Sequence, residues 1–151
     1  MKVYLDTAVL VAASVADHPH HSQSLAILQM VRKKAMTGHI SGHGLSETYA
    51  VLTRTPFTPP IYPAEAWKLL SMNVLPYFQI VTLTALMYRE TTQECADSGW
   101  IGRRIYDALH CAARRKQLAI ASTLSTSAIS NSWRRIWQTA SVPLRTCMVV
   151  D

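Results

Sequence analysis

Short β-prone runs alternate along this chain with longer stretches in which apolar residues recur at helical spacing. The first run, Val3–Leu5, ends in Asp6-Thr7 and is followed by a helical pattern through Val15. The same reasoning predicts further strands at 39–41 and 78–81 and further helices at 17–38, 44–55, 63–70, 84–98 and 105–116. Because strands alternate with helices, the pattern predicts an α/β domain with a mostly parallel sheet.

Length and composition fit a single domain that spans residues 1–151. The chain has 151 residues, of which 49% are apolar and 16% are charged, so it is long enough to bury a core of its own. The longest near-apolar stretch, 9–16, is too short to cross a bilayer, and the chain opens directly into a strand-like run. We therefore expect a cytoplasmic protein with no signal peptide and no membrane contact.

Cysteine usage adds no covalent framework. Cys95, Cys111 and Cys147 are odd in number, lie far apart and fit no metal-ligand spacing. The sequence therefore predicts neither a disulfide scaffold nor a zinc ribbon, and the three side chains are expected to fill the core.

The charge balance is basic, with 15 Lys plus Arg against 9 Asp plus Glu and a net charge of +6. Such a surface attracts a polyanion such as nucleic acid, or an acidic protein. Basic side chains that are merely solvated explain the same charge about equally well. The placement of the few acids has to decide between these alternatives.

Three acids stand out by position. Asp6 follows a predicted strand and precedes the hydroxyl of Thr7, at the end of a parallel sheet where ligands bind. Taken alone, an Asp at the end of a strand is more often an N-cap than a catalyst, and Asp6 could cap the helix that starts near Ala8. Glu47 and Asp107 have a solvated-helix alternative, but Asp107 sits in a largely apolar helix where an unpaired carboxylate would be costly. Converging carboxylates are what a hard divalent cation such as Mg²⁺ needs.

Three motifs give the chain a family resemblance. The segments 3–10 (VYLDTAVL), 45–54 (LSETYAVLTR) and 105–110 (IYDALH) resemble the PIN domain, in particular the VapC-like toxin ribonucleases. The resemblance covers residues 2–116. It implies a PIN-like three-layer α/β/α sandwich, Mg²⁺ or Mn²⁺ in an acidic pocket, endonucleolytic cleavage of RNA, a cognate antitoxin and a homodimer. Asp6, Glu47 and Asp107 carry over as the metal-binding and catalytic acids.

The chemistry expected of such a pocket is hydrolysis. A cation held by Asp6 and Asp107 would lower the pKa of a bound water and orient the scissile phosphate, with Glu47 completing the pocket. One or two ions fit the sequence equally. Thr7, Arg103 and Arg104 are candidate substrate contacts, although solvated arginines are an equal alternative.

A histidine cluster precedes the second predicted helix. His18, His20 and His21 flank a proline and have no carboxylate partner at a diagnostic spacing. We interpret them as surface residues rather than as metal ligands.

The resemblance ends at Lys116. The family continues with a strand and a Thr-x-Asn or Thr-x-Asp turn that completes the pocket, which 123–125 (TLS) echoes only in part. Read one base out of frame, residues 119–137 permit codons that spell the usual ending, including that Asn, so we hypothesise that the tail is a frameshifted ending. Alternation at 118–122 predicts a short edge strand and 133–137 an amphipathic turn, with the poorest packing of the fold from Gln117 onward.

The altered tail leaves two functions open. One is a metal-dependent endoribonuclease, the toxin of a type II toxin-antitoxin system, whose activity the tail reduces. The other is a catalytically impaired PIN-like remnant that acts only as an antitoxin- or RNA-binding module.

Overall fold

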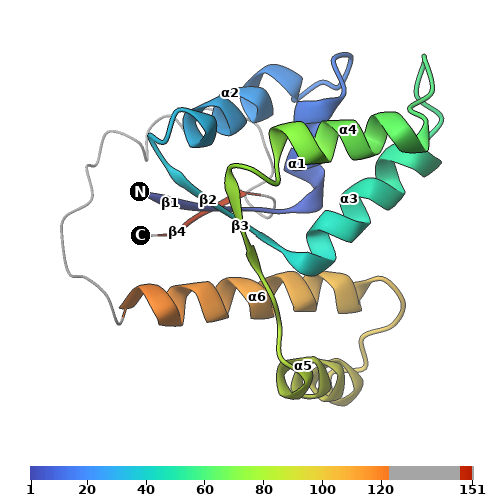
Figure 1. Cartoon of the computed structure of the whole chain (residues 1–151). Coiled ribbons are helices and arrows are strands. Elements are labelled where there is room, and N and C mark those ends of the chain that lie inside the picture. Colours follow the sequence, from blue (N-terminus) through green and yellow to red (C-terminus); the bar gives the residue numbers. More distant parts are fainter. Residues whose placement is uncertain (123–146, 151) are drawn as a thin grey trace.

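A computed structural model describes residues 1–122 and 147–150 of the chain, with four strands and six helices in those ranges (Figure 1). The elements are β1 (Lys2–Leu5), α1 (Thr7–Ser14), α2 (His21–Arg32), β2 (Thr37–Ser41), α3 (Gly42–Arg54), α4 (Pro63–Asn73), β3 (Phe78–Val81), α5 (Ala85–Asp97), α6 (Arg104–Ser122) and β4 (Cys147–Val150). The predicted α/β pattern is confirmed, and β3 has the predicted bounds.

The four strands form one sheet in the order β3-β2-β1-β4. β1 pairs in parallel with β2, β2 in parallel with β3, and β1 antiparallel with β4. The carboxyl ends of β1, β2 and β3 therefore meet at one edge of the sheet. Asp6 follows β1 at that edge, and Ser41 is the last residue of β2.

The helices form two layers, as the predicted three-layer sandwich requires. α1, α2 and α4 lie on one side of the sheet and α5 and α6 on the other, while α3 rises from the sheet edge beside α4 (Figure 1). The main core lies under the first layer and includes Leu5, Leu10, Ile40 and Phe78. A smaller cluster of Tyr4, Val81 and Ala113 seats α6 on the opposite face.

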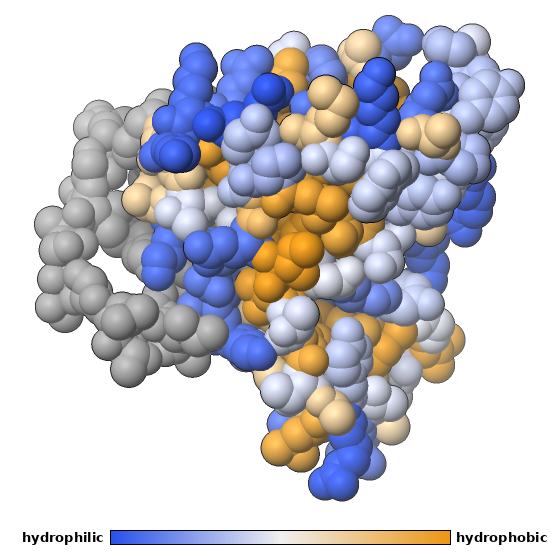
Figure 2. Space-filling view, viewed as in Figure 1, coloured by the Kyte–Doolittle hydropathy of each residue, from blue (hydrophilic) through white to orange (hydrophobic). Residues whose placement is uncertain are grey.

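One face of the molecule carries an apolar area at its centre (Figure 2). Ile80 of β3 is 43% exposed, while Phe78 and Val81 of the same strand are buried. β3 is the outer strand of the sheet on this side, so one of its faces is left without a covering helix over Ile80.

Two predicted helix boundaries are wrong. α2 begins at His21 rather than at 17, because residues 16–20 form turns in which the backbone N–H of His18 donates to Val15 O and that of His21 to His18 O. It ends at Arg32 rather than near 38, because Lys34 takes a positive φ of 59° that a helix does not continue through. The strand β2 then begins at Thr37.

The predicted edge strand at 118–122 is also wrong, because α6 continues through Ser122. The segment 117–121 (QLAIA) contains good helix formers and no Gly or Pro, so helix propensity outweighs the short alternation. The expectation of poor packing from Gln117 onward is wrong at Gln117 itself, which is buried with its Nε2 2.8 Å from His39 Nε2. The turn at 123–125 and the amphipathic turn at 133–137 lie outside the described residues.

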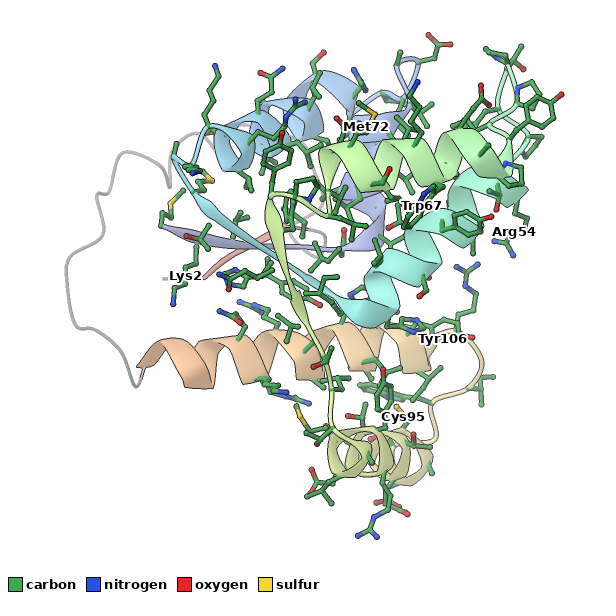
Figure 3. All side chains as sticks on the ribbon, in the orientation of Figure 1. Lys2, Arg54, Trp67, Met72, Cys95 and Tyr106 are labelled. Atoms are coloured by element: carbon green, nitrogen blue, oxygen red, sulfur yellow. The ribbon has the colours of Figure 1, made fainter. Side chains whose placement is uncertain are left out.

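The cysteine prediction is half confirmed. Cys95 is buried on α5, on the side of α6 (Figure 3), whereas Cys111 is exposed because it lies on the outward side of α6. Within residues 1–122 and 147–150, no helix is long and apolar enough to cross a membrane.

Candidate active site

Asp6 lies where β1 turns into α1 and caps that helix. Its backbone is extended, with φ −95° and ψ 178°, and its Oδ1 accepts from the backbone N–H of Val9 at 3.1 Å, so it is the N-cap that the sequence allowed. Burial raises the pKa of Asp6 to about 7, against the lowering effect of the Val9 and Ala8 N–H groups. The nearby charges of Glu47 and Asp107 are smaller contributions to the same upward shift.

Glu47 faces the same space from α3, but hydrogen-bond donors surround it. Its Oε2 accepts from Thr7 Oγ1 at 2.7 Å and lies 3.3 Å from His110 Nε2, and its Oε1 is 3.6 Å from Arg103 Nη2. Burial acts to raise the pKa of Glu47, but the hydrogen bonds of Thr7 and His110 and the charges of His110 and His43 outweigh it, so the net shift is downward. Glu47 is therefore held as a carboxylate.

The sequence at the start of α3 brings Glu47 toward α6. Ser41 caps the helix, because its Oγ accepts from the backbone N–H of Gly44 at 2.8 Å. A Cβ on Gly44 would lie 2.7 Å from His110 Cε1 and 3.0 Å from Ser41 Oγ. Only glycine at this position lets α3 and α6 approach so closely.

His110 connects the strands with Glu47. Its Nδ1 lies 3.3 Å from both Tyr4 Oη and Ser41 Oγ, while its Nε2 faces Glu47. A carboxylate only accepts, so Nε2 carries the proton in that contact, and in the neutral ring the single lone pair of Nδ1 accepts from one of the two hydroxyls. The ring is thereby fixed on both sides and holds Glu47 in position.

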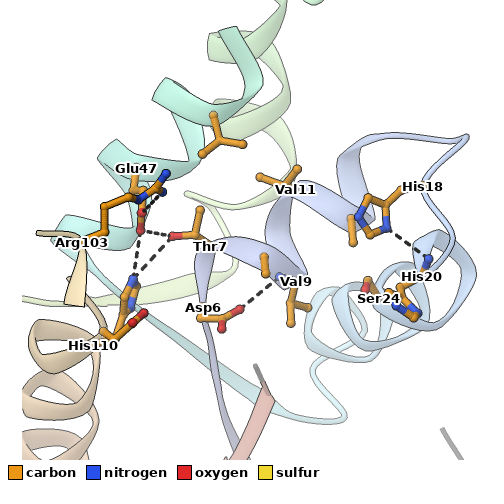
Figure 4. A pocket seen from close by; sticks show the side chains of 14 residues that line it. Asp6, Thr7, Val9, Val11, His18, His20, Ser24, Glu47, Arg103 and His110 are labelled. Carbon is orange, nitrogen blue, oxygen red and sulfur yellow. Dashed lines mark hydrogen bonds and ion pairs between the residues drawn. The ribbon is translucent and has the colours of Figure 1, made fainter. Parts of the chain in front are cut away.

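These side chains line a pocket of about 550 Å³ (Figure 4). Figure 4 shows Glu47, Thr7, Arg103 and His110 at one end, Asp6 beside them, and a histidine-lined end beyond Val9 and Val11. Its lining residues are Asp6, Thr7, Ala8, Val9, Val11, Ala12, His18, His20, Ser24, Glu47, Val51, Arg103, Asp107 and His110. Three carboxylates, each from a different element, thus share one pocket.

The three carboxylates of the pocket are the type of ligand that a divalent cation prefers. Mg²⁺ and Mn²⁺ prefer carboxylate oxygens, and the charges that act on the half-buried Asp6 carboxyl, those of Glu47 and Asp107, are both negative. As the side chains stand, no three His, Cys, Asp or Glu groups within the described part of the chain are close enough together to hold one ion. Mg²⁺ binding by few protein ligands and several waters is compatible with such an open arrangement.

Comparison with known proteins identifies the family. The family model of the PIN domain matches residues 3–126, which is most of the chain. This chain belongs to the PIN domain family. The match runs past Lys116, where the motif resemblance ended, so the family pattern extends further along the chain than its motifs suggested.

Two solved structures show the same PIN fold. The crystal structure of VapC20 from Mycobacterium tuberculosis, described as a toxin that cleaves the sarcin-ricin loop, has a TM-score of 0.59 and 17% identity, covering 78% of this chain and 83% of that one. VapBC2 from Rickettsia felis, bound to a DNA fragment from its promoter, has a TM-score of 0.51 and 22% identity, covering 90% and 93%. No curated protein sequence matches this PIN domain.

Most of the predicted site residues gather in the PIN domain pocket. Asp6, Thr7, Glu47, Arg103 and Asp107 all line it. Arg104 is exposed and is not among the lining residues. The sequence argument that burial makes an unpaired Asp107 costly is wrong, because this carboxylate lies on the exposed side of α6 where the pocket opens to solvent.

The histidine interpretation also needs correction. His18 and His20 are half-buried and line the pocket instead of lying freely on the surface, because the turns before α2 fold them back toward α1. His21 is not a lining residue, and its Nδ1 lies 3.0 Å from the carbonyl oxygen of Ala12.

Sequence reasoning missed His110 and its two hydroxyl partners. His110 lies three residues after Asp107, so both point to the same side of a helix. That spacing is the one sequence signal that marks His110 as a site residue. Tyr4 and Ser41 carry no such signal, because they meet His110 only through the sheet.

Proposed function

We propose that this PIN domain is a metal-dependent endoribonuclease, the toxin component of a type II toxin-antitoxin system. The observation that carries the proposal is the position of Asp6, a half-buried carboxyl at the carboxyl edge of the sheet that shares a pocket with Glu47 and Asp107. PIN domains of the VapC type are generally nucleases, which supports the same reaction class.

In this proposal Asp6, Glu47 and Asp107 hold Mg²⁺ or Mn²⁺. The bound cation supplies Lewis-acid chemistry, which makes a water a better nucleophile and offsets charge on the scissile phosphate. Asp6 provides the charge that the cation neutralises, and its N-cap bond fixes the carboxyl at the sheet edge. His110 and Thr7 position Glu47, and Arg103 offers a positive charge to phosphate at the pocket rim, where its side chain is 70% exposed. Arg104 is proposed as a second, outer phosphate contact.

The proposed substrate and partners follow from charge and from the structural neighbours. A net charge of +6 favours a polyanion, and the neighbour VapC20 is described as a toxin that cleaves the sarcin-ricin loop. The neighbour VapBC2 is a toxin-antitoxin complex, which supports a cognate antitoxin for this chain. We further propose a homodimer and a cytoplasmic location, where RNA and antitoxin are both present.

The test is cleavage of end-labelled single-stranded RNA by the purified protein. Cleavage is expected with Mg²⁺ or Mn²⁺, to stop with EDTA, and to resume on adding the metal back. Asp6→Asn should lower the rate by about a hundredfold or more, because it removes charge that holds the cation with little change of shape.

Asp97→Asn is the matched control for Asp6→Asn. It makes the same chemical change on exposed α5, outside the pocket, so it should cleave like the parent protein. Cleavage that survives both EDTA and Asp6→Asn would rule the mechanism out.

One observation favours the second candidate function, a remnant that only binds antitoxin or RNA. Within the described residues the acids do not form a cluster of three that could grip one ion as they stand. RNA or antitoxin binding without cleavage at any Mg²⁺ or Mn²⁺ concentration would favour this candidate.

A further inference from the structure

The pocket extends well beyond the part that the three acids line. It follows α1, from Asp6 at the start of the helix to Ala12 near its end, and then reaches His18 and His20. At 1.5 Å per residue this part of α1 spans about 9 Å, which exceeds the rise of one nucleotide along a strand. The acids occupy one end only (Figure 4).

The surface between the two ends is apolar. Ala8, Val9, Val11 and Ala12 of α1 line it on one side and Val51 of α3 on the other. Val9, Val11 and Ala12 are buried in the fold, so this floor is firmly packed. Apolar walls with a few polar groups at the end are typical of sites that take a planar organic ligand.

The two histidines at the far end are held in defined tautomers by their neighbours. His18 Nδ1 accepts from the backbone N–H of His20 at 3.1 Å, so the neutral ring carries its proton on Nε2. His20 Nδ1 lies 3.4 Å from the carbonyl oxygen of the Gln23 side chain and donates to it, which leaves Nε2 as an acceptor. The ring centroids are 5.7 Å apart, so a donor and an acceptor stand side by side.

We infer that the histidine end of the pocket is a nucleobase subsite, which takes one unstacked base of single-stranded RNA next to the scissile phosphate. This inference rests on the proposed nuclease function and adds its substrate specificity. The base lies on the apolar floor of Val11, Ala12 and Val51, and His18 and His20 contact its edge. Base edges present neighbouring donors and acceptors, which a donor-acceptor pair of histidines matches.

A base fits this end better than a phosphate or a metal ion. A phosphate would lie on apolar walls and face two neutral rings with one donor between them and the hydroxyl of Ser24, with no positive charge among the described residues at this end. A metal ion would find two histidines, and no group of three ligands exists in the described part of the chain. Unstacked bases, in contrast, are recognised by proteins through apolar and aromatic contact with hydrogen bonds to their edges.

The test measures RNA binding in EDTA, where the proposed cleavage is off. A short single-stranded RNA is compared with oligonucleotides that are abasic at one position each, by fluorescence anisotropy. One abasic position should weaken binding roughly 5- to 100-fold, the range for loss of one stacked base. His18→Ala and His20→Ala should weaken binding of the intact RNA and leave the RNA abasic at that position unaffected.

His21→Ala is the matched control. It removes a histidine beside His20 that does not line the pocket. The loss of RNA affinity caused by the abasic position should therefore be the same in His21→Ala as in the parent protein. Circular dichroism confirms folding of each variant, and His18→Gln, which keeps a donor, should bind better than His18→Ala.

The outcomes separate the two proposals. The subsite is overturned if no abasic position weakens RNA binding. It is also overturned if the histidine variants lose the same affinity for intact and for abasic RNA. Both results leave the nuclease proposal standing. A histidine-dependent abasic effect without cleavage on adding Mg²⁺ or Mn²⁺ supports the subsite and overturns the nuclease. Absence of any RNA binding in EDTA overturns the subsite, and absence of RNA cleavage with Mg²⁺ or Mn²⁺ overturns the nuclease.

Discussion

The Asp6 side and the Glu47 side of the pocket hold the same functional group in opposite electrostatic conditions. Glu47 is hydrogen-bonded by Thr7 and His110 and forms an ion pair with Arg103, and its pKa is lowered. Burial raises the pKa of Asp6 to about 7, and its one short side-chain hydrogen bond comes from the backbone of Val9. Within the described residues, donors and positive groups face Glu47, whereas the charges near Asp6 are negative, so in the proposed function the cation would act mainly on Asp6.

The largest effect should come from Asp6→Asn measured without metal. Folded Asp6 keeps its proton up to about pH 7, whereas the unfolded chain releases it near 3.8. The free energy of unfolding of the parent protein should therefore fall as the pH rises from about 4 to about 7, and Asn should remove this slope. At pH 7 in EDTA the variant should be more stable by on the order of 2 to 4 kcal/mol, measured by urea unfolding.

Addition of Mg²⁺ or Mn²⁺ provides the internal control for that comparison. The ion should stabilise the parent protein and act less on Asp6→Asn, because binding to the folded state adds stability by mass action. A variant with the same pH slope as the parent protein would contradict the raised pKa of Asp6.

The next effect should come from Gly44→Ala, which disturbs only the Glu47 side. The new methyl group would lie 2.7 Å from His110 Cε1, so α3 or the ring has to shift. We expect a loss of about 1 to 3 kcal/mol in the free energy of unfolding, the usual cost of overpacking, measured by urea unfolding.

Gly42→Ala is the matched control on the same helix. Its new Cβ would lie 3.7 Å from Ile80, an ordinary contact, and a Gly-to-Ala change at such a position is neutral or mildly stabilising. If the two variants are equally stable, the close approach of α3 and α6 does not require glycine at position 44.

His110→Gln should follow in size. The amide retains a donor for Glu47 but does not span the distance to Tyr4 and Ser41, so Glu47 loses its fixed position. We expect a 10- to 100-fold lower cleavage rate, as for loss of a group that orients a metal ligand, in single-turnover assays. The apparent metal affinity should fall together with the rate, whereas a purely structural role would leave the metal affinity of the folded fraction unchanged.

The smallest effect should come from Arg103→Ala. Its ion pair with Glu47 is long at 3.6 Å and its side chain is 70% exposed, so stability should change by less than about 1 kcal/mol. If Arg103 meets phosphate, the slope of log affinity against log salt should fall by about 1 in RNA titrations. An unchanged slope would show that the Arg103 side chain contacts no phosphate.

Local sequence patterns predicted those elements that are determined by residues close together in the sequence. Phe78–Val81 and the Thr84 cap of α5 follow from apolar spacing and a hydroxyl before a helix. The end of α6 did not follow, because alternation over five residues is weak evidence beside the helix propensity of 117–121. The acids were predicted from motifs, whereas His110 was missed because its partners Tyr4 and Ser41 come from two strands distant in sequence.

The pairing of β1 with β4 has a consequence for synthesis on the ribosome. β1 (Lys2–Leu5) is made well before its antiparallel partner Cys147–Val150, because the two strands lie at opposite ends of the described elements. Asp6, Glu47 and Asp107 therefore all emerge before the strand that closes the sheet beside Asp6. Contacts so far apart in sequence form late and slowly because of the entropy of closing the loop, so the nascent chain should gain the strand beside β1 only after β4 has emerged.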